Sequence, residues 1–187
     1  MINYKELLNK KKPIIVQIGS NDGVLGEEYG LHELLDELND FTLILVEPIG
    51  KFFDNLINVY GKYGDKIKYV NKAITDTNGY FNMVLDYGMS RIVEHKGDII
   101  VEGITWSNFI NELNITDIDL LLLDCEGYEF DILKQIDFKY NIIKIIRYEY
   151  YWIKDKIECD SFLSNNGFNI DYCSHDYIYN KIAFKND

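Results

Sequence analysis

Acidic residues follow two apolar runs of the length expected for buried strands. The run "IDLLLLD" brings Asp124 to the end of one strand, with Glu126 and Glu129 just beyond it, and "IIKIIRYE" ends in Glu149. Carboxylates gathered at one edge of a sheet repel one another unless a ligand, a metal or a proton is shared among them. The pattern therefore indicates a site. The alternatives are a helix cap at Asp124, a first helical turn at Glu126 and Glu129, and an ion pair of Glu149 with Arg147 or Lys154.

A glycine-rich stretch, "IIVQIGSNDGVLGEEYG", follows the first apolar run. Gly19 and Gly23 remove Cβ atoms where a ligand would lie against the main chain, and Ser20, Asn21 and Asp22 supply short polar groups for hydrogen bonds. Ligands of open parallel sheets bind at the carboxyl ends of the strands. The stretch predicts a site for a nucleotide-type cofactor, and a tight strand-to-helix turn is the structural alternative.

The spacing of the glycines narrows the type of cofactor. Gly19, Gly23 and Gly26 miss the dinucleotide pattern, and no phosphate-binding Gly-Lys-Ser/Thr motif is present. Glu47 ends the second apolar run, where a carboxylate can accept hydrogen bonds from both ribose hydroxyls. A ribose without pyrophosphate indicates an adenosine ligand, of which S-adenosylmethionine is the commonest. Asp76 is a candidate for contact with the adenine, with a plain turn residue as the alternative.

The elements that must position these residues alternate between apolar runs and segments of helical periodicity, which predicts an α/β fold with a mostly parallel sheet covered on both faces. Between the two halves of the chain, the pattern predicts a strand over 67–76, a hairpin partner over 79–86 and a loop over 87–98. A helix closed near Gly167 leads to a final hairpin of 169–173 and 177–184. The four buried strands are expected at 13–18, 41–47, 118–124 and 142–149.

Composition limits the class of protein. A chain of 187 residues with 47% apolar residues is read as one domain over 1–187. Its formal charge of -12 disfavours nucleic-acid binding, and no run approaches the roughly 18 apolar residues of a membrane span. We therefore expect a cytoplasmic protein without a nucleic-acid or membrane partner. The cysteines, Cys125, Cys159 and Cys173, lack zinc-like spacing, so no structural metal is expected.

The motifs together resemble the FkbM-type S-adenosylmethionine-dependent methyltransferases. The matching pieces, in the order of that family, are "VQIGSNDG", "LILVEPIGKFFDNLINVY", "NKAITDTNG", "ITWSNFINEL", "IDLLLLDCEGYEFDILKQIDF" and "IIRYEY". The resemblance implies a class I methyltransferase fold, Rossmann-like and doubly wound, with a seven-stranded mixed sheet of order 3-2-1-4-5-7-6. It also implies that Gly19, Asn21 and Gly23 line the methionine part of the cofactor, that Glu47 holds the ribose, and that Asp124 with Glu126 lies beside the transferred methyl.

Two positions depart from the family pattern. Gln17 stands where many members carry an acid, and Ser107 stands where an aspartate would be expected. Gln17 can hydrogen-bond the cofactor but offers no charge to its ammonium group, so weaker binding is expected. The same departures support the alternative function, an inactive methyltransferase-like binding or interaction module. A nicotinamide-dependent oxidoreductase would need the missing dinucleotide fingerprint.

The resemblance implies O-methylation of a sugar or another small hydroxylated acceptor, for which a base must remove the hydroxyl proton. Asp124 is the first candidate, and His95 and His175 are alternates. A metal held by Asp124, Glu126 and Glu149 would also activate a diol and is kept as an alternative.

Two segments are candidates for acceptor binding. The expected loop before the "DCEG" strand carries Arg91 and His95 and is placed to cover the site. After the strand that ends in Glu149, the aromatic rings of Tyr151 and Trp152 could stack on a sugar ring. A homodimer is left open.

Overall fold

The main sheet carries the cofactor-side residues at one edge. The computed structural model describes residues 12–24, 30–86, 89–172 and 179–185. Within them the strand order is β10-β11-β9-β8-β1-β2-β3. The parallel strands are β1 (Ile14–Ile18), β2 (Thr42–Val46), β3 (Ile67–Val70), β8 (Asp117–Leu123) and β9 (Ile142–Glu149). The last strand, β11 (Asn180–Phe184), runs antiparallel to both β9 and β10 (Asn169–Tyr172).

When the seven strands of this sheet are renumbered 1 to 7 in chain order, β8 to β11 become 4 to 7 and the spatial order is 3-2-1-4-5-7-6. The predicted doubly wound class is therefore confirmed. The register places Val16 of β1 between Ile44 of β2 and Leu121 of β8. These central strands are nearly continuous apolar runs because helices cover both faces of the sheet.

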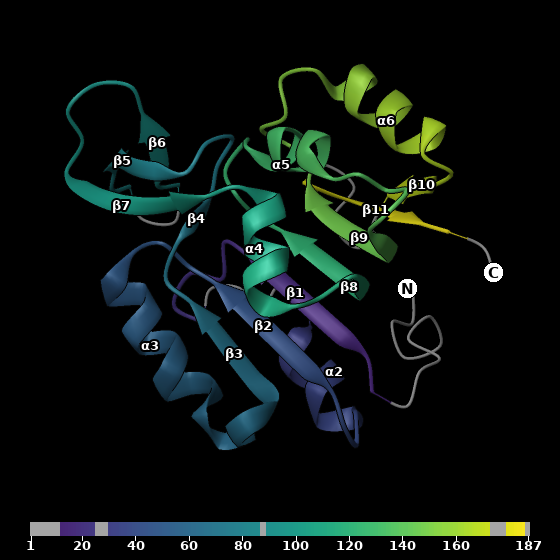
Figure 1. Ribbon diagram of the computed structural model, residues 1–187, viewed down its shortest axis with the longest axis horizontal. Coiled ribbons are helices and arrows are strands. Elements are labelled where there is room, and N and C mark those ends of the chain that lie inside the picture. Colours follow the sequence, from purple (N-terminus) through teal and green to yellow (C-terminus); the bar gives the residue numbers. More distant parts are fainter. Residues whose placement is uncertain (1–11, 25–29, 87–88, 173–178, 186–187) are drawn as a thin grey trace.

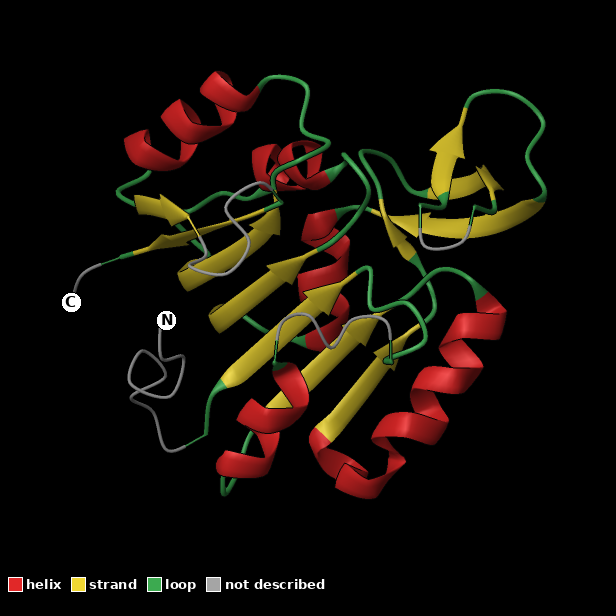
Figure 2. Ribbon diagram, turned by 180° about the vertical axis from the view of Figure 1, so that it is seen from behind, coloured by secondary structure: helices red, strands yellow, loops and turns green. Residues whose placement is uncertain are grey.

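Two helical layers bury those faces (Figures 1 and 2). Helices α2 (Leu31–Glu37) and α3 (Gly50–Tyr60) pack against one face, where Leu35 and Leu56 join Leu43 and Leu122 in one apolar cluster. Helices α4 (Trp106–Leu113), α5 (Glu129–Gln135) and α6 (Lys156–Asn165) pack against the other face. A short 3-10 helix, η2 (Gly61–Lys66), continues α3 towards β3.

A second sheet lies beyond the carboxyl ends of the parallel strands (Figure 2), in the order β4-β7-β5-β6. Its strands are β4 (Ala73–Ile74), β5 (Gly79–Val84), β6 (Arg91–Val93) and β7 (Ile99–Ile104). A small apolar cluster that includes Ile49, Met83 and Val101 joins it to the loop after β2. The sequence patterns did not predict this sheet.

The expectations for 67–98 need correction. The strand expected over 67–76 is divided between the two sheets, and β5 pairs antiparallel with β7 and β6 rather than with its predicted hairpin partner. The expected loop over 87–98 contains β6. The pairings of β7 with β4 and β5 join residues far apart in sequence, such as Ala73 and Gly103, so a local periodicity could not reveal them.

The C-terminal elements follow the expectation. Helix α6 ends at Asn165, and Gly167 has a φ of +84°, which lets the chain reverse into β10. Strands β10 and β11 pair as the predicted hairpin, and its turn lies outside the described residues. None of the helices in the described part of the chain is long and apolar enough to cross a membrane.

Candidate functional site

A cavity of about 1040 Å³ lies between the carboxyl edge of the main sheet and the second sheet. Gly19, Glu47, Asp124 and Glu149, which follow or end β1, β2, β8 and β9, form one side of its lining. The second sheet contributes Ile74, Met83, Arg91 and Ile92. The topology therefore brings the ends of four strands and a separate sheet around one space, where an open α/β fold binds its ligand.

The turn after β1 has left-handed backbone at Gly19 (φ 80°) and Asn21 (φ 49°). A Cβ atom on Gly19 would lie 1.7 Å from the carbonyl oxygen of Asp124, so glycine is required for β1 and β8 to end side by side. A Cβ on Gly23 would lie 2.9 Å from Leu56 and Tyr60. Both glycines therefore have a structural reason beside the predicted one, space for a ligand; Gly19 also lines the cavity, whereas Gly23 does not.

Glu47 joins two turns of the site. Its Oε2 accepts a hydrogen bond from the amide of Asn21 at 2.9 Å, and its Oε1 accepts one from the amide of Ile49 at 2.8 Å. The side chain is only 4% exposed, and burial raises its pKa to about 7 against the effect of these hydrogen bonds. Each carboxylate oxygen can accept a further hydrogen bond, so Glu47 can hold a ribose while it bridges the turns.

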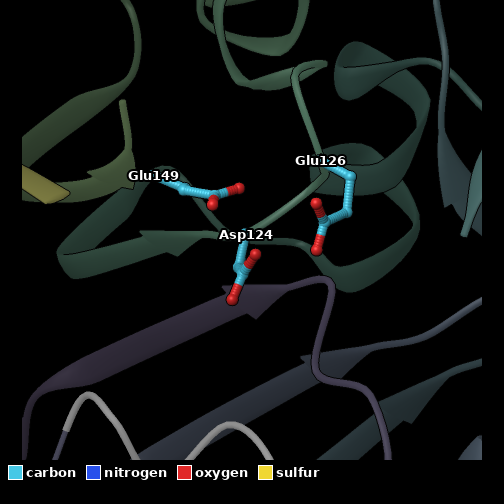
Figure 3. Close-up of side chains that lie close together, drawn as sticks. All are labelled: Asp124, Glu126 and Glu149. Atoms are coloured by element: carbon cyan, nitrogen blue, oxygen red, sulfur yellow. The ribbon is translucent and has the colours of Figure 1, made fainter. Parts of the chain in front are cut away.

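The three predicted acids come together (Figure 3). Asp124, Glu126 and Glu149 each offer an oxygen within 4.8 Å of the others, and all three line the cavity. The amide of Asp124 donates to the carbonyl of Ile18 at 3.0 Å, which ties the acid to the end of β1. Burial, and then the charges of Asp124 and Asp86, raise the pKa of Glu126 to about 7. Near neutral pH this group therefore exchanges a proton readily beside Asp124.

A fourth acid, Glu129, holds the loop that carries two of these groups. Its Oε1 accepts from the amide of Cys125 at 2.6 Å, and its Oε2 accepts from the amide of Gly127 at 3.0 Å. The side chain is fully buried, and burial raises its pKa to about 7. The sequence predicted Glu129 as an acid of the site or of the first helical turn, and α5 does begin at Glu129, but its support of the loop was not predicted.

Other predicted cofactor residues do not reach the cavity lining. Gln17 and Ser20 are buried, and the hydroxyl of Ser20 donates to the carbonyl of Gln17 at 3.1 Å. Asp22 accepts a hydrogen bond from the amide of Val24 within the turn. Asp76 is exposed and lies outside the lining, as do Asp22 and Gly23. Among the predicted cofactor residues, those on the lining are Gly19, Asn21, Glu47 and Asp124.

The acceptor candidates divide in the same way. Arg91 and Trp152 line the cavity, whereas His95 and Tyr151 are exposed outside its lining, and His175 lies outside the described residues. The structure adds Tyr179, which periodicity could not place because it reaches the cavity through the pairing of β9 with β11.

The strand order, the turn after β1 and the acid after β2 define a class I S-adenosylmethionine-dependent methyltransferase fold. The family model described as the methyltransferase FkbM domain matches residues 4–172. The chain therefore belongs to the FkbM methyltransferase family.

Solved structures share this fold at low sequence identity. The methyltransferase FkbM from Methylobacillus flagellatus KT has a TM-score of 0.64 and 14% identity, over 93% of this chain and 44% of that chain. The S-adenosylhomocysteine-bound methyltransferase PaMTH1 from Podospora anserina has a TM-score of 0.55 and 13% identity, over 93% of this chain and 72% of that chain. This chain thus spans less than half of the FkbM structure. No curated protein matches.

Membership of a methyltransferase family implies S-adenosylmethionine as the cofactor. The residues present fit this cofactor: the cavity can hold a nucleoside, and Glu47 retains capacity to accept ribose hydroxyl groups beside the turn at Gly19 and Asn21.

Proposed function

We propose that the protein transfers the methyl group of S-adenosylmethionine to a hydroxyl of a small acceptor, with a sugar as the favoured class. The observation that carries this proposal is the arrangement of Asp124, Glu126 and Glu149 within 4.8 Å of one another in the cavity lined by the cofactor-side turn and Glu47. Carboxylates so placed can accept the hydrogen bonds of a polyhydroxylated acceptor and remove a proton.

The roles of the residues follow from their positions. The turn at Gly19 and Asn21 and the carboxylate of Glu47 hold the cofactor, which when bound supplies an activated methyl group and its own leaving group. Asp124 is the general base for the acceptor hydroxyl. Glu126, whose raised pKa lies near neutrality, hydrogen-bonds the acceptor and shares the released proton with Asp124. Alignment of the two reactants is the main contribution of the protein, since well-oriented reactions gain up to about 7 to 11 kcal/mol in this way.

Asp124→Asn tests the proposed base, because it keeps the shape of the side chain and removes its basic group. Methyl transfer to a hydroxylated acceptor should fall by about 100-fold or more, the range typical of general-base loss, while the affinity for S-adenosylhomocysteine changes little. Radiolabelled transfer and calorimetry measure the two quantities on the same samples. Wild-type turnover in the variant would assign the base elsewhere.

Two controls separate the alternatives. An inactive module would show no methyl transfer, whether or not it binds S-adenosylhomocysteine. If Glu47 holds the cofactor, Glu47→Ala should weaken the binding of S-adenosylhomocysteine by about 1 to 3 kcal/mol. If the acids instead held a metal, EDTA would abolish transfer. We expect transfer to be unchanged by EDTA.

A further inference from the structure

Three aromatic residues lie together at one side of the cavity and form what we call the aromatic shelf: Tyr151, Trp152 and Tyr179. Their exposed fractions are 41%, 45% and 48%, and Trp152 and Tyr179 line the cavity. The ring of Tyr151 lies between them, edge-on to Trp152 at a centroid distance of 4.6 Å and 5.1 Å from the ring of Tyr179. Large rings that remain this exposed beside a polar cavity indicate a surface that a ligand covers.

Main-chain contacts fix the shelf in place. The antiparallel pairing of β9 with β11 ends at Glu149 and Asn180, which brings the residues after Glu149 beside Tyr179. The carbonyl oxygen of Tyr179 accepts a hydrogen bond from the amide of Tyr151 at 3.2 Å. The ammonium group of Lys156 donates to the carbonyl of Tyr151 at 2.7 Å. These contacts hold the backbone of Tyr151 and Tyr179, and the ring of Tyr151 packs against the rings of Trp152 and Tyr179, so the free energy needed to order the rings around a ligand is reduced.

The shelf adjoins the acidic loop. Gly127 has a φ of +98°, and a Cβ atom there would lie 3.3 Å from the Cβ of Trp152 and 3.2 Å from its carbonyl oxygen. Because Gly127 follows Glu126 directly, Trp152 is seated against the turn that presents this acid. One ligand in the cavity can thus contact an aromatic face and the carboxylates of Asp124, Glu126 and Glu149 together.

We propose that the aromatic shelf binds the ring of the acceptor and that this acceptor is a pyranose, stacked through its C–H face on Trp152 and Tyr179. A pyranose offers an apolar face for aromatic rings and an edge of hydroxyls for carboxylates, which is the combination this part of the cavity presents. The shelf selects ring compounds, and the acids select their hydroxyls. The inference rests on the proposed function, because it names the acceptor class of the same site.

Binding of defined glycosides tests the shelf directly and does not require the natural acceptor. The full chain, saturated with S-adenosylhomocysteine, is titrated with the methyl pyranosides of glucose, galactose, mannose and rhamnose, and with sorbitol as an acyclic polyol. Trp152 fluorescence reports binding, because the other tryptophan, Trp106, is only 1% exposed. At least one pyranoside should bind at least about tenfold more tightly than sorbitol, a difference of about 1.4 kcal/mol.

Matched variants locate the binding energy. Trp152→Ala and Tyr179→Ala should each lower the affinity for that pyranoside at least about tenfold, as measured by saturation-transfer NMR. Tyr179→Phe keeps the ring and should retain the affinity. Tyr80→Ala, which removes a ring that is 79% exposed on β5, should have no effect. The affinity for S-adenosylhomocysteine, measured on every variant, confirms that each is folded.

The outcomes distinguish the two proposals. If no pyranoside binds more tightly than sorbitol, or if the two alanine variants bind it as the wild type does, the shelf is not the acceptor site. In either case the proposed function stands as long as S-adenosylhomocysteine binds and methyl transfer to some hydroxyl is measured. If S-adenosylhomocysteine does not bind, the proposed function itself fails.

Discussion

Glu129 carries a carboxyl group into the interior, where the amides of Cys125 and Gly127 donate to it. These hydrogen bonds favour its charged form, yet burial dominates and raises its pKa to about 7. Holding the charge therefore costs stability near neutral pH. Glu129 fixes the shape of the loop that carries Asp124 and Glu126. Function rather than stability therefore accounts for a glutamate at this position.

The pH dependence of stability should report this residue. The pKa of Glu129 rises from 4.5 in the unfolded chain to about 7, so the folded protein binds the proton more tightly. The contribution of Glu129 to the free energy of unfolding therefore falls as pH rises from about 4.5 to about 7. Glu129→Gln removes that fall. The free energy of unfolding of the variant, relative to that of wild type, should therefore rise by up to about 3 kcal/mol between pH 5 and pH 8, as measured by urea denaturation.

The exposed Glu33 supplies the control, since Glu33→Gln removes a carboxylate at the surface of α2 and should leave the pH profile unchanged. Parallel profiles for wild type and Glu129→Gln would contradict the assignment. Turnover of Glu129→Gln should fall at all pH values, because the side-chain NH2 of glutamine is a donor and cannot accept the hydrogen bond that Oε2 of Glu129 takes from the amide of Gly127.

At the scale of elements, the ends of β1 and β8 approach each other so closely that position 19, directly after β1, tolerates no side chain. The amide of Asp124 donates to the carbonyl of Ile18, and the Cα of Gly19 faces the carbonyl of Asp124. This packing sets the position of Asp124 relative to the cofactor-side turn. The glycine thus contributes to the site through contact between two strands.

Gly19→Ala should destabilise the protein by at least about 3 kcal/mol, because the new Cβ meets a backbone carbonyl and the φ of +80° is unfavourable for alanine. Gly61→Ala is the matched control: its φ of -56° and ψ of -25° are helical, and no atom lies within 4 Å of an added Cβ. That variant should gain about 0.4 to 1 kcal/mol. Chemical denaturation compares them, and equal midpoints would refute the packing argument.

At the scale of the whole molecule, the cavity belongs to two sheets. Strands β1, β2, β8 and β9 end on one side of it, and β4, β5 and β6 contribute to the other. The cluster of Ile49, Met83 and Val101 fixes the second sheet against the loop after β2. A ligand between them contacts both sheets, and the segment expected as a covering loop contributes to the second sheet through β6.

This arrangement separates two residues that the sequence places four positions apart. Arg91 on β6 lines the cavity, whereas His95 in the following turn is exposed outside its lining. Arg91→Ala should raise the KM for a hydroxylated acceptor by about tenfold, the scale of one charged hydrogen bond, with cofactor affinity unchanged. His95→Ala should leave both constants at wild-type values. Steady-state kinetics decides, and equal effects of the two substitutions would argue against the wall position of Arg91.

The sequence by itself determined the class of fold and the main acids of the site, because both depend on short-range order. Continuous apolar runs specify buried parallel strands, and the residue that ends such a run must emerge at the carboxyl edge, as Glu47, Asp124 and Glu149 do. Only the tertiary structure decided the second sheet, the buried support from Glu129 and the contact of Tyr179 with Tyr151 beside the cavity. These depend on pairings between distant segments and on which space is already filled by protein, and no local pattern of residue types encodes either.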